Sequence, residues 1–255
     1  MYPRPQTLYT PRLCLHPLSP GDESAMVALL TNEEIAKTYM TPVFASQEEV
    51  VALFERFRLL SLDDQRLVYG IFLDERLIGF LNEVYREETA IELGYVIHPD
   101  YKGRGFAAEA FTVVIRALFC MGFRQIRAGA FEDNRASMRV MEKCGLTPTG
   151  ETEIIPYRGE NHRCICYAVS MEDIVGEISR METLLDTLYQ RVSEDPGVVR
   201  DDGFQESLRQ LIQYYEDGRW QFHYRMDEMG LLPRDLKRGV LSEDGVYNFL
   251  SDLEK

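Results

Sequence analysis

The most informative stretch of the sequence is Gly94-Tyr-Val-Ile-His-Pro-Asp-Tyr-Lys-Gly-Arg-Gly-Phe-Ala-Ala-Glu-Ala110. A β-rich run over Ala90–Ile97 leads into a glycine-rich turn, and an alanine-rich helical pattern begins at Phe106. Glycines at 103 and 105 let backbone N–H groups converge on one point without obstruction by a Cβ atom. Those donors, the positive end of the helix, Lys102 and Arg104 together predict a diphosphate site. A tight turn with permissive glycines is the alternative explanation of the same spacing.

Patterns on both sides of this turn predict a mixed α/β domain. Alternating apolar and polar residues over Leu8–Leu18 predict an opening strand, and Ser46-Gln-Glu-Glu49 predicts a capped helix start. Further strand patterns lie at 67–73, 77–85, 126–130, 147–155 and 162–169, and further helical patterns at 106–123 and 134–144. Because strands and helices do not alternate regularly, we expect a mostly antiparallel sheet with flanking helices, not a doubly wound nucleotide-binding fold.

The character of the sequence changes at Met171, so we predict two domains, 1–170 and 171–255. Apolar residues from Ile174 to Val192 recur at intervals of three and four, which predicts an amphipathic helix. Helical patterns follow at 205–229 and 243–253, and no strand pattern is evident. The second domain is therefore expected to be all-α. Its aromatic residues favour a packed bundle, with a docking face for a protein partner or a second copy as the alternative.

Composition argues against several classes of function. A net charge of −14 disfavours a nucleic-acid surface and docking on anionic lipid, since both need basic patches. No run approaches the roughly 18 apolar residues of a membrane span, and the first residues lack a signal-peptide pattern. The five cysteines lie in apolar runs and are expected to be reduced core residues, which predicts a cytoplasmic protein. The scattered histidines share no ligand spacing, so no metal site is expected.

Three segments resemble the GNAT superfamily of N-acetyltransferases, in the family's order. Lys102-Gly-Arg-Gly105-Phe-Ala107 is similar to the signature Gln/Arg-x-x-Gly-x-Gly/Ala, with lysine in place of the usual first residue. Asn134-Arg-Ala-Ser137-Met-Arg-Val-Met141-Glu-Lys-Cys-Gly145-Leu is similar to the second signature. Leu8–Leu18 resembles the first strand of the branch that includes the ribosomal-protein N-acetyltransferases. The resemblance covers residues 1 to about 170 and implies the GNAT fold and an acetyl-CoA-dependent acyltransferase.

The segment from Leu232 to Leu250 resembles the closing motif of a small helical bacterial family of unknown function. Members of that family also occur fused to acetyltransferases. This resemblance implies a bacterial protein and brings no activity with it.

The first resemblance implies roles for matching positions. The backbone of Val96 and Ile97 is expected to pair with the pantetheine arm of acetyl-CoA, and amides from Lys102 to Ala107 to hold the pyrophosphate. Asn134 is expected to reach the cofactor arm or a water. The implied cofactor-binding residues are Val96, Ile97, Lys102, Gly103, Arg104, Gly105, Phe106, Ala107 and Asn134. A neutral amine would attack the thioester directly, and positioning and polarisation would supply most of the acceleration.

Two residues are candidates for the acid–base steps. Glu92, on the strand expected to face the thioester, is the candidate base, with a solvated carboxylate as the alternative and Glu83 and Glu87 as rivals. Many family members have a tyrosine where this chain has Met141, so the usual proton donor is missing. Ser137 matches the serine proposed for this role in the ribosomal branch, and a helix serine that bonds the cofactor or backbone is the alternative.

We therefore expect an enzyme that acetylates a primary amine, either a protein N-terminal amine or a small molecule. Tyr95 and His98 are reserve proton donors. The mild acidity of the first domain suits a cationic amine. The alternative, favoured by the departure at Met141, is a non-catalytic acyl-CoA-binding regulatory module with a helical tail that binds a protein partner. No nucleic-acid or membrane partner is expected.

Overall fold

The computed structural model describes residues 3–253 of the chain, without the side chain at position 243. The chain divides into two compact units, one that extends to Val169 and one that begins at Ser170. Within residues 3–253, no helix combines the length and the apolar character that crossing a bilayer requires.

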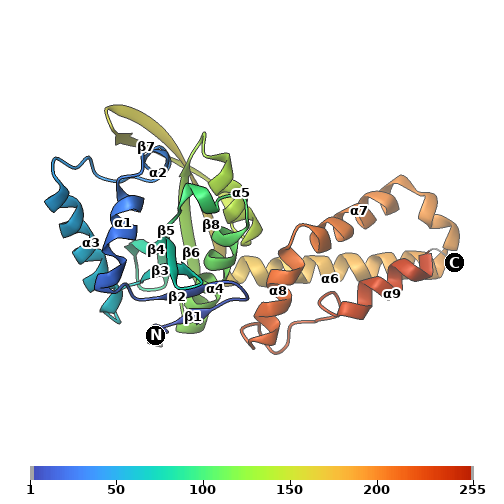
Figure 1. The fold of residues 1–255 in the computed structure, drawn as a ribbon. Coiled ribbons are helices and arrows are strands. Elements are labelled where there is room, and N and C mark those ends of the chain that lie inside the picture. Colours follow the sequence, from blue (N-terminus) through green and yellow to red (C-terminus); the bar gives the residue numbers. More distant parts are fainter. Residues whose placement is uncertain (1–2, 254–255) are drawn as a thin grey trace. The chain divides into compact units, whose positions relative to one another are not determined.

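An eight-stranded sheet forms the centre of the first unit, with the strand order β1-β2-β3-β4-β5-β6-β8-β7 (Figure 1). The strands are β1 (Leu8–Tyr9), β2 (Cys14–His16), β3 (Val68–Leu73), β4 (Arg76–Arg86), β5 (Ala90–Ile97), β6 (Gln125–Phe131), β7 (Thr147–Tyr157) and β8 (Glu160–Ser170). Adjacent strands from β1 to β5 pair antiparallel, as do β7 and β8, whereas β5 and β6 are parallel. The predicted mixed, mostly antiparallel sheet is confirmed.

Helices cover both faces of this sheet. They are α1 (Glu23–Leu30), α2 (Glu33–Ala36), α3 (Gln47–Leu62), α4 (Phe106–Met121) and α5 (Arg135–Lys143). Figure 1 shows α1 and α3 on one side of the sheet and α4 and α5 on the other. Met26 of α1 and Phe54 of α3 pack into one apolar core with Phe80 of β4. Burial of these large side chains is what holds the helices on the sheet.

The prediction of one opening strand over Leu8–Leu18 is wrong. The segment folds into a hairpin in which β1 and β2 pair antiparallel, with Leu8 opposite Leu15. Pro11 lies at the turn, where it has no N–H to contribute to a ladder, and the amide of Thr10 closes the turn on the carbonyl of Leu13 at 2.9 Å. The hairpin carries Arg12 at its tip.

The site is positioned by an interrupted pairing between β5 and β6. The parallel register runs from Ala90 opposite Gln125 to Glu92 opposite Arg127 and ends there. Beyond this point residues 93–97 have an open edge on that side, because β6 no longer follows β5. The two strands therefore separate and leave a gap in the sheet.

Alternation along β5 assigns its side chains to opposite faces of the sheet. Val96 belongs to the core under α1 and α3, so Glu92 points to the same face. Tyr95 points to the other face, where its ring packs against Phe111 of α4 with 4.9 Å between centroids.

The described part of the second unit contains helices and no strands, as predicted. Its α-helices are α6 (Met171–Glu194), α7 (Asp202–Glu216), α8 (Arg219–Glu228) and α9 (Glu243–Leu253). The single helix predicted over 205–229 is wrong, because Gly218 adopts φ 94° and starts a new helix. Ser170 caps α6 with Asp173 in a capping box.

Aromatic side chains of the second unit make internal contacts. Tyr214 and His223 form a buried hydrogen-bonded pair at 2.9 Å. Trp220 donates to the carbonyl of Val240 at 2.9 Å, and the buried carboxylate of Glu182 accepts the amide of Val240. These contacts support the interpretation of the aromatic residues as packing residues.

Candidate functional site

Two cavities meet where β5 and β6 separate. The first, of about 500 Å³, includes the glycine turn, the start of α4 and one face of α5, and we refer to it as the loop cavity. The second, of about 740 Å³, is lined partly by the β7–β8 hairpin, and we refer to it as the hairpin cavity. Residues that line both cavities are Thr38, Tyr39, Leu93, Gly94 and Gly129. The gap between the strands is therefore a shared boundary.

The two cavities carry opposite charge. Among the described residues, the charged ones that line the loop cavity are all basic, namely Lys102, Arg139 and Lys143. In the same part of the chain, the hairpin cavity is lined by one cation, Arg127, and by four carboxylates, Glu83, Glu92, Glu151 and Glu153. Glu83 is ion-paired with Arg66 and Arg86 at 2.7 Å, whereas the other three have no ion pair within the described residues. In an acidic protein, positive charge is thus gathered in one cavity and negative charge in its neighbour.

The glycine turn presents free backbone donors to the loop cavity. Gly103 and Gly105 adopt φ 74° and φ 81°, where side chains with a Cβ are disfavoured. The Lys102 amide donates to the carbonyl of Pro99 at 3.1 Å, so it is not available to a ligand, and the predicted set beginning at Lys102 is corrected on this point. Within residues 3–253, the amides from Gly103 to Ala107 donate no hydrogen bond of good geometry.

The two cationic side chains of the turn, Lys102 and Arg104, differ in whether they reach the loop cavity. The Lys102 side chain lines the loop cavity, whereas Arg104 does not. The Arg104 guanidinium lies 4.8 Å from the ring centroid of Phe106 and 6.0 Å from that of Tyr101. A contribution of Arg104 to a ligand would therefore come from its backbone amide.

The two positions expected to pair with a pantetheine arm present their backbone to different sides. The Val96 carbonyl points toward β4, because a Cβ atom on Gly79 would collide with it. His98, two residues further along, also faces β4 and donates its amide to the carbonyl of Ile78 at 2.8 Å. Alternation then directs the peptide groups of Tyr95 and Ile97 to the open edge. The expectation is corrected for Val96, and Tyr95 takes its place beside Ile97.

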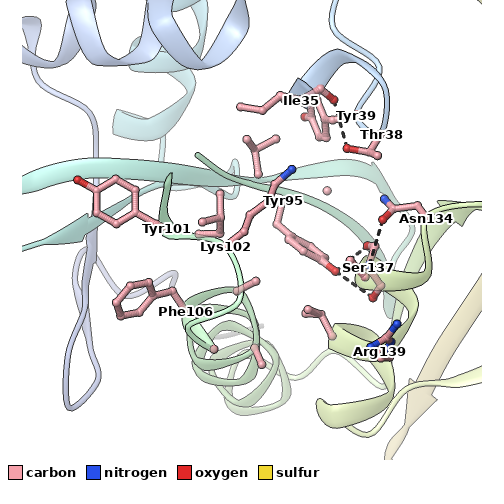
Figure 2. A pocket seen from close by; sticks show the side chains of 18 of the residues that line it. Ile35, Thr38, Tyr39, Tyr95, Tyr101, Lys102, Phe106, Asn134, Ser137 and Arg139 are labelled. Atoms are coloured by element: carbon pink, nitrogen blue, oxygen red, sulfur yellow. Dashed lines mark hydrogen bonds between the residues drawn. The ribbon is translucent and has the colours of Figure 1, made fainter. Parts of the chain in front are cut away.

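Polar side chains gather at the start of α5 (Figure 2). Asn134 is the N-cap, and its Oδ1 accepts the Ser137 amide at 3.1 Å, so its side-chain NH2 remains as a donor. The Oγ of Ser137 lies 2.7 Å from the hydroxyl of Tyr95. Burial raises the pKa of the Tyr95 hydroxyl, and the hydrogen bond with Ser137, which lowers this pKa, is the weaker effect. Either hydroxyl can be the donor in this pair, and the Tyr95 hydroxyl is also within 3.2 Å of the Ser137 carbonyl, which can accept from it. When Tyr95 donates to Ser137 Oγ, the Ser137 hydroxyl hydrogen can point at a ligand.

Met141 is fully buried and lines neither cavity. The phenol beside Ser137 comes from β5 instead, through Tyr95. His98 accepts the amide of Asp100 at 3.3 Å and lines neither cavity, which leaves Tyr95 as the reserve residue at the site.

Glu92 lies in the hairpin cavity and Ser137 in the loop cavity. Burial and the nearby carboxylate of Glu153 raise the pKa of Glu92, against a weaker opposing effect of Arg127. A carboxylate with a raised pKa is a stronger base. The rival Glu87 pairs with Arg127 at 3.2 Å and lines neither cavity.

Some site residues were not found from the sequence. Tyr39 lines both cavities and donates to Asn82 Oδ1 at 2.7 Å, and no motif marks either residue. Arg139 and Lys143 line the loop cavity. Their spacing of four residues on a predicted helix places them on one face and was an available signal.

Two of the five cysteines, Cys164 and Cys166, line the hairpin cavity. All five cysteines are free, and only Cys144 and Cys164 are buried. The prediction of core cysteines is therefore wrong for Cys120, which is exposed, and only partly right for Cys14 and Cys166. Among residues 3–253 there is no group of three or more side chains suited to hold a metal ion.

The chain is similar to known acetyltransferases. Residues 12–147 match the model of an acetyltransferase (GNAT) domain, and residues 171–255 match a domain of unknown function, DUF4298. The uncharacterized N-acetyltransferase YoaA of Bacillus subtilis is 29% identical over 148 residues, 56% of this chain and 84% of that protein.

Solved structures show the same fold in the first unit. A GNAT-family acetyltransferase from Bacillus anthracis aligns with a TM-score of 0.57 and 23% identity over 64% of this chain and 98% of its own. An acetyltransferase from Salmonella typhimurium that modifies the N-terminal serine of a 50S ribosomal subunit protein aligns with a TM-score of 0.56 and 20% identity. That alignment covers 63% of this chain and 96% of the other.

Proposed function

Because the chain belongs to the GNAT family of acetyltransferases, and so is an acyltransferase, we propose that it acetylates a primary amine that carries additional positive charge. The observation that supports this substrate class is the opposite charge of two cavities that share a boundary. Acetyl-CoA, the co-substrate of the family, is anionic and fits the basic cavity. The acidic cavity is left for the acceptor.

The donor is proposed to occupy the loop cavity. Free amides from Gly103 to Ala107 and the start of α4 would hold the diphosphate, and Lys102, Arg139 and Lys143 would add charge attraction. The pantetheine arm would pair with the open edge of β5. Asn134 would donate its side-chain NH2 to that arm. The thioester would then reach the shared boundary at Gly94 and Gly129.

The acceptor is proposed to enter through the hairpin cavity, where Glu92 takes a proton from its ammonium group, directly or through a water. The amine nitrogen then forms a bond to the acetyl carbon while the carbon–sulfur bond breaks, the nitrogen gives up its second proton, which the departing thiolate receives, and the acetyl group never bonds to the protein. Ser137, supported by Tyr95, donates a hydrogen bond to the departing sulfur. The base Glu92 on one side of the boundary and the hydrogen-bond donor Ser137 on the other suit direct transfer of the acetyl group from sulfur to nitrogen.

Methionine at position 141, in place of the tyrosine of many family members, therefore no longer favours a non-catalytic module. Ser137, on the same helix as Met141, can supply the hydrogen-bond donor, and the phenol of Tyr95 reaches it from β5. The Salmonella enzyme modifies the N-terminal serine of a ribosomal protein, and an N-terminal ammonium group carries one positive charge. Three carboxylates without ion pairs favour an acceptor with a second cation, such as a diamine or a basic peptide.

An amine series tests the proposal. A five-carbon diamine, the matching monoamine, and peptides with a lysine or a glutamate after the N-terminal residue would be compared by mass spectrometry of the acetylated product. We expect kcat/KM to be roughly tenfold higher for each doubly charged acceptor, the effect of about one favourable charge interaction in a partly screened site.

The double variant Glu151→Gln/Glu153→Gln should remove this preference without changing the KM for acetyl-CoA. Equal kcat/KM across the wild-type series would refute the proposed substrate class. Absence of acetylation with every amine would refute the proposed acceptor site.

A further inference from the structure

Arg12 fastens the β1–β2 hairpin to the glycine turn. Its Nη1 donates to the carbonyl of Arg104 at 2.9 Å. Its Nε donates to Oε2 of Glu109 at 2.7 Å and its backbone amide to Oε1 at 3.0 Å. The guanidinium also lies 4.5 Å from the ring centroid of Phe106. Arg12 does not line the loop cavity, so its contacts reach the turn from outside.

The hydrogen bond to Arg104 fixes the direction of a neighbouring amide. The peptide unit between Arg104 and Gly105 is trans, and in a trans peptide the C=O and N–H groups point in opposite directions. Arg12 holds the carbonyl from outside the cavity, so the Gly105 N–H points toward the cavity that Gly105 lines. Glycine at φ 81° is flexible by itself, and an external clamp restricts it.

Arg12 also offsets a charge at the same place. Glu109 lies in the first turn of α4, the end of the helix where an anion would bind. Burial would raise the pKa of Glu109, but hydrogen bonds from Thr10 and Arg12 outweigh that effect and lower the pKa. Glu109 is therefore negative at neutral pH, and without a partner it would repel a diphosphate.

We infer that Arg12 is a positioning residue for the diphosphate of acetyl-CoA, which acts through the Arg104 carbonyl and Glu109. The inference rests on the proposed use of the loop cavity by the donor. Without Arg12, the Gly105 amide loses its fixed direction and the charge of Glu109 is left uncompensated. Both changes weaken the hold on the diphosphate and leave the acetyl end of the donor untouched.

The test compares two acyl donors, acetyl-CoA and S-acetylpantetheine, which has the thioester and the arm but no diphosphate. For Arg12→Ala we expect KM and Kd for acetyl-CoA to rise roughly 10- to 100-fold, the effect of one lost charge-assisted hydrogen bond, with kcat retained. The value of kcat/KM for S-acetylpantetheine should match the wild type. Adding Glu109→Gln should restore part of the lost affinity, because the repulsive charge is gone.

Arg163→Ala is the matched control. Arg163 forms an exposed ion pair with Glu132 at 3.0 Å and does not line the loop cavity, so this variant should bind acetyl-CoA normally. Arg12→Lys keeps the charge but not the forked geometry and should fall between the wild type and Arg12→Ala. It also serves as the test variant if the melting temperature shows that Arg12→Ala does not fold.

An Arg12→Ala protein with unchanged affinity for acetyl-CoA would overturn the inference. So would an equal loss with both donors, because S-acetylpantetheine has no diphosphate to position. Failure of the wild type to bind acetyl-CoA at all would instead overturn the proposed donor site, and the inference with it.

Discussion

Replacing Glu92 by glutamine removes the proposed base and almost nothing else. The Glu92 carboxylate has no ion pair within the described residues and lies outside the loop cavity, so the shape of the site and the Kd for acetyl-CoA should be retained. General bases contribute about 10²- to 10⁴-fold to a rate. We therefore expect kcat to fall by about 100-fold or more, about 3 kcal/mol in barrier height.

The pH dependence gives this prediction a second readout. Burial and Glu153 hold the pKa of Glu92 above its ordinary value of 4.5. The base works only when ionised, so kcat/KM should fall as the pH drops through that raised pKa. Glu153→Gln removes a like charge, which lowers the pKa of Glu92. The acid limb of the profile should therefore move to lower pH.

The assay is acetylation of one amine at saturating acetyl-CoA, followed by mass spectrometry from acidic to neutral pH. Comparison of variants with the same amine cancels the titration of the substrate. Glu87→Gln is the control, because Glu87 lines neither cavity and should leave kcat unchanged. Wild-type kcat for Glu92→Gln at every pH would refute the assignment of Glu92 as the base.

Three further predictions concern the loop cavity and the second unit. Valine at both Gly103 and Gly105, where φ is positive, costs about 1–3 kcal/mol at each position and should abolish calorimetric binding of acetyl-CoA while the circular dichroism stays unchanged. Ser137→Ala should lower kcat about 100-fold, whereas Tyr95→Phe, which loses only the bond to Ser137, should lower it about fivefold; wild-type kcat for Ser137→Ala would remove its donor role. Burial lowers the pKa of His223 from 6.5 to about 4, so protonation opposes folding and the second unit should lose up to about 3 kcal/mol of stability as the pH falls from 6.5 to 4. Denaturant titrations should show this slope in the wild type, and its persistence in His223→Gln would contradict the assignment.

Local determinants made the centre of the fold predictable. The strand Ala90–Ile97 and the helix start at Phe106 were predicted with the bounds that the structure has. Their signals, a β-rich run, a glycine turn and an alanine-rich run, lie within a few residues of the elements that they specify. The hairpin at Pro11 and the break at Gly218 carried equally local signals, a proline and a glycine, which the longer apolar patterns obscured.

Contacts between distant segments could not be predicted. Tyr95 meets Ser137 across 42 residues, and Arg12 meets Glu109 across 97 residues. Both depend on the strand order and register of the finished sheet, which no local pattern specifies. The same holds for the position of Glu92, because the end of the β5–β6 ladder decides which cavity it enters.

In the proposed reaction, donor and acceptor meet across the boundary of the two cavities. This arrangement is tested most directly by calorimetric titration of a conjugate in which the sulfur of CoA is joined through an acetyl bridge to a five-carbon diamine, with CoA as the reference. We expect one conjugate to bind per chain, about 100-fold more tightly than CoA, and Glu92→Gln/Glu153→Gln to lose that gain. Equal affinities of the wild type for the conjugate and for CoA would contradict the proposed arrangement.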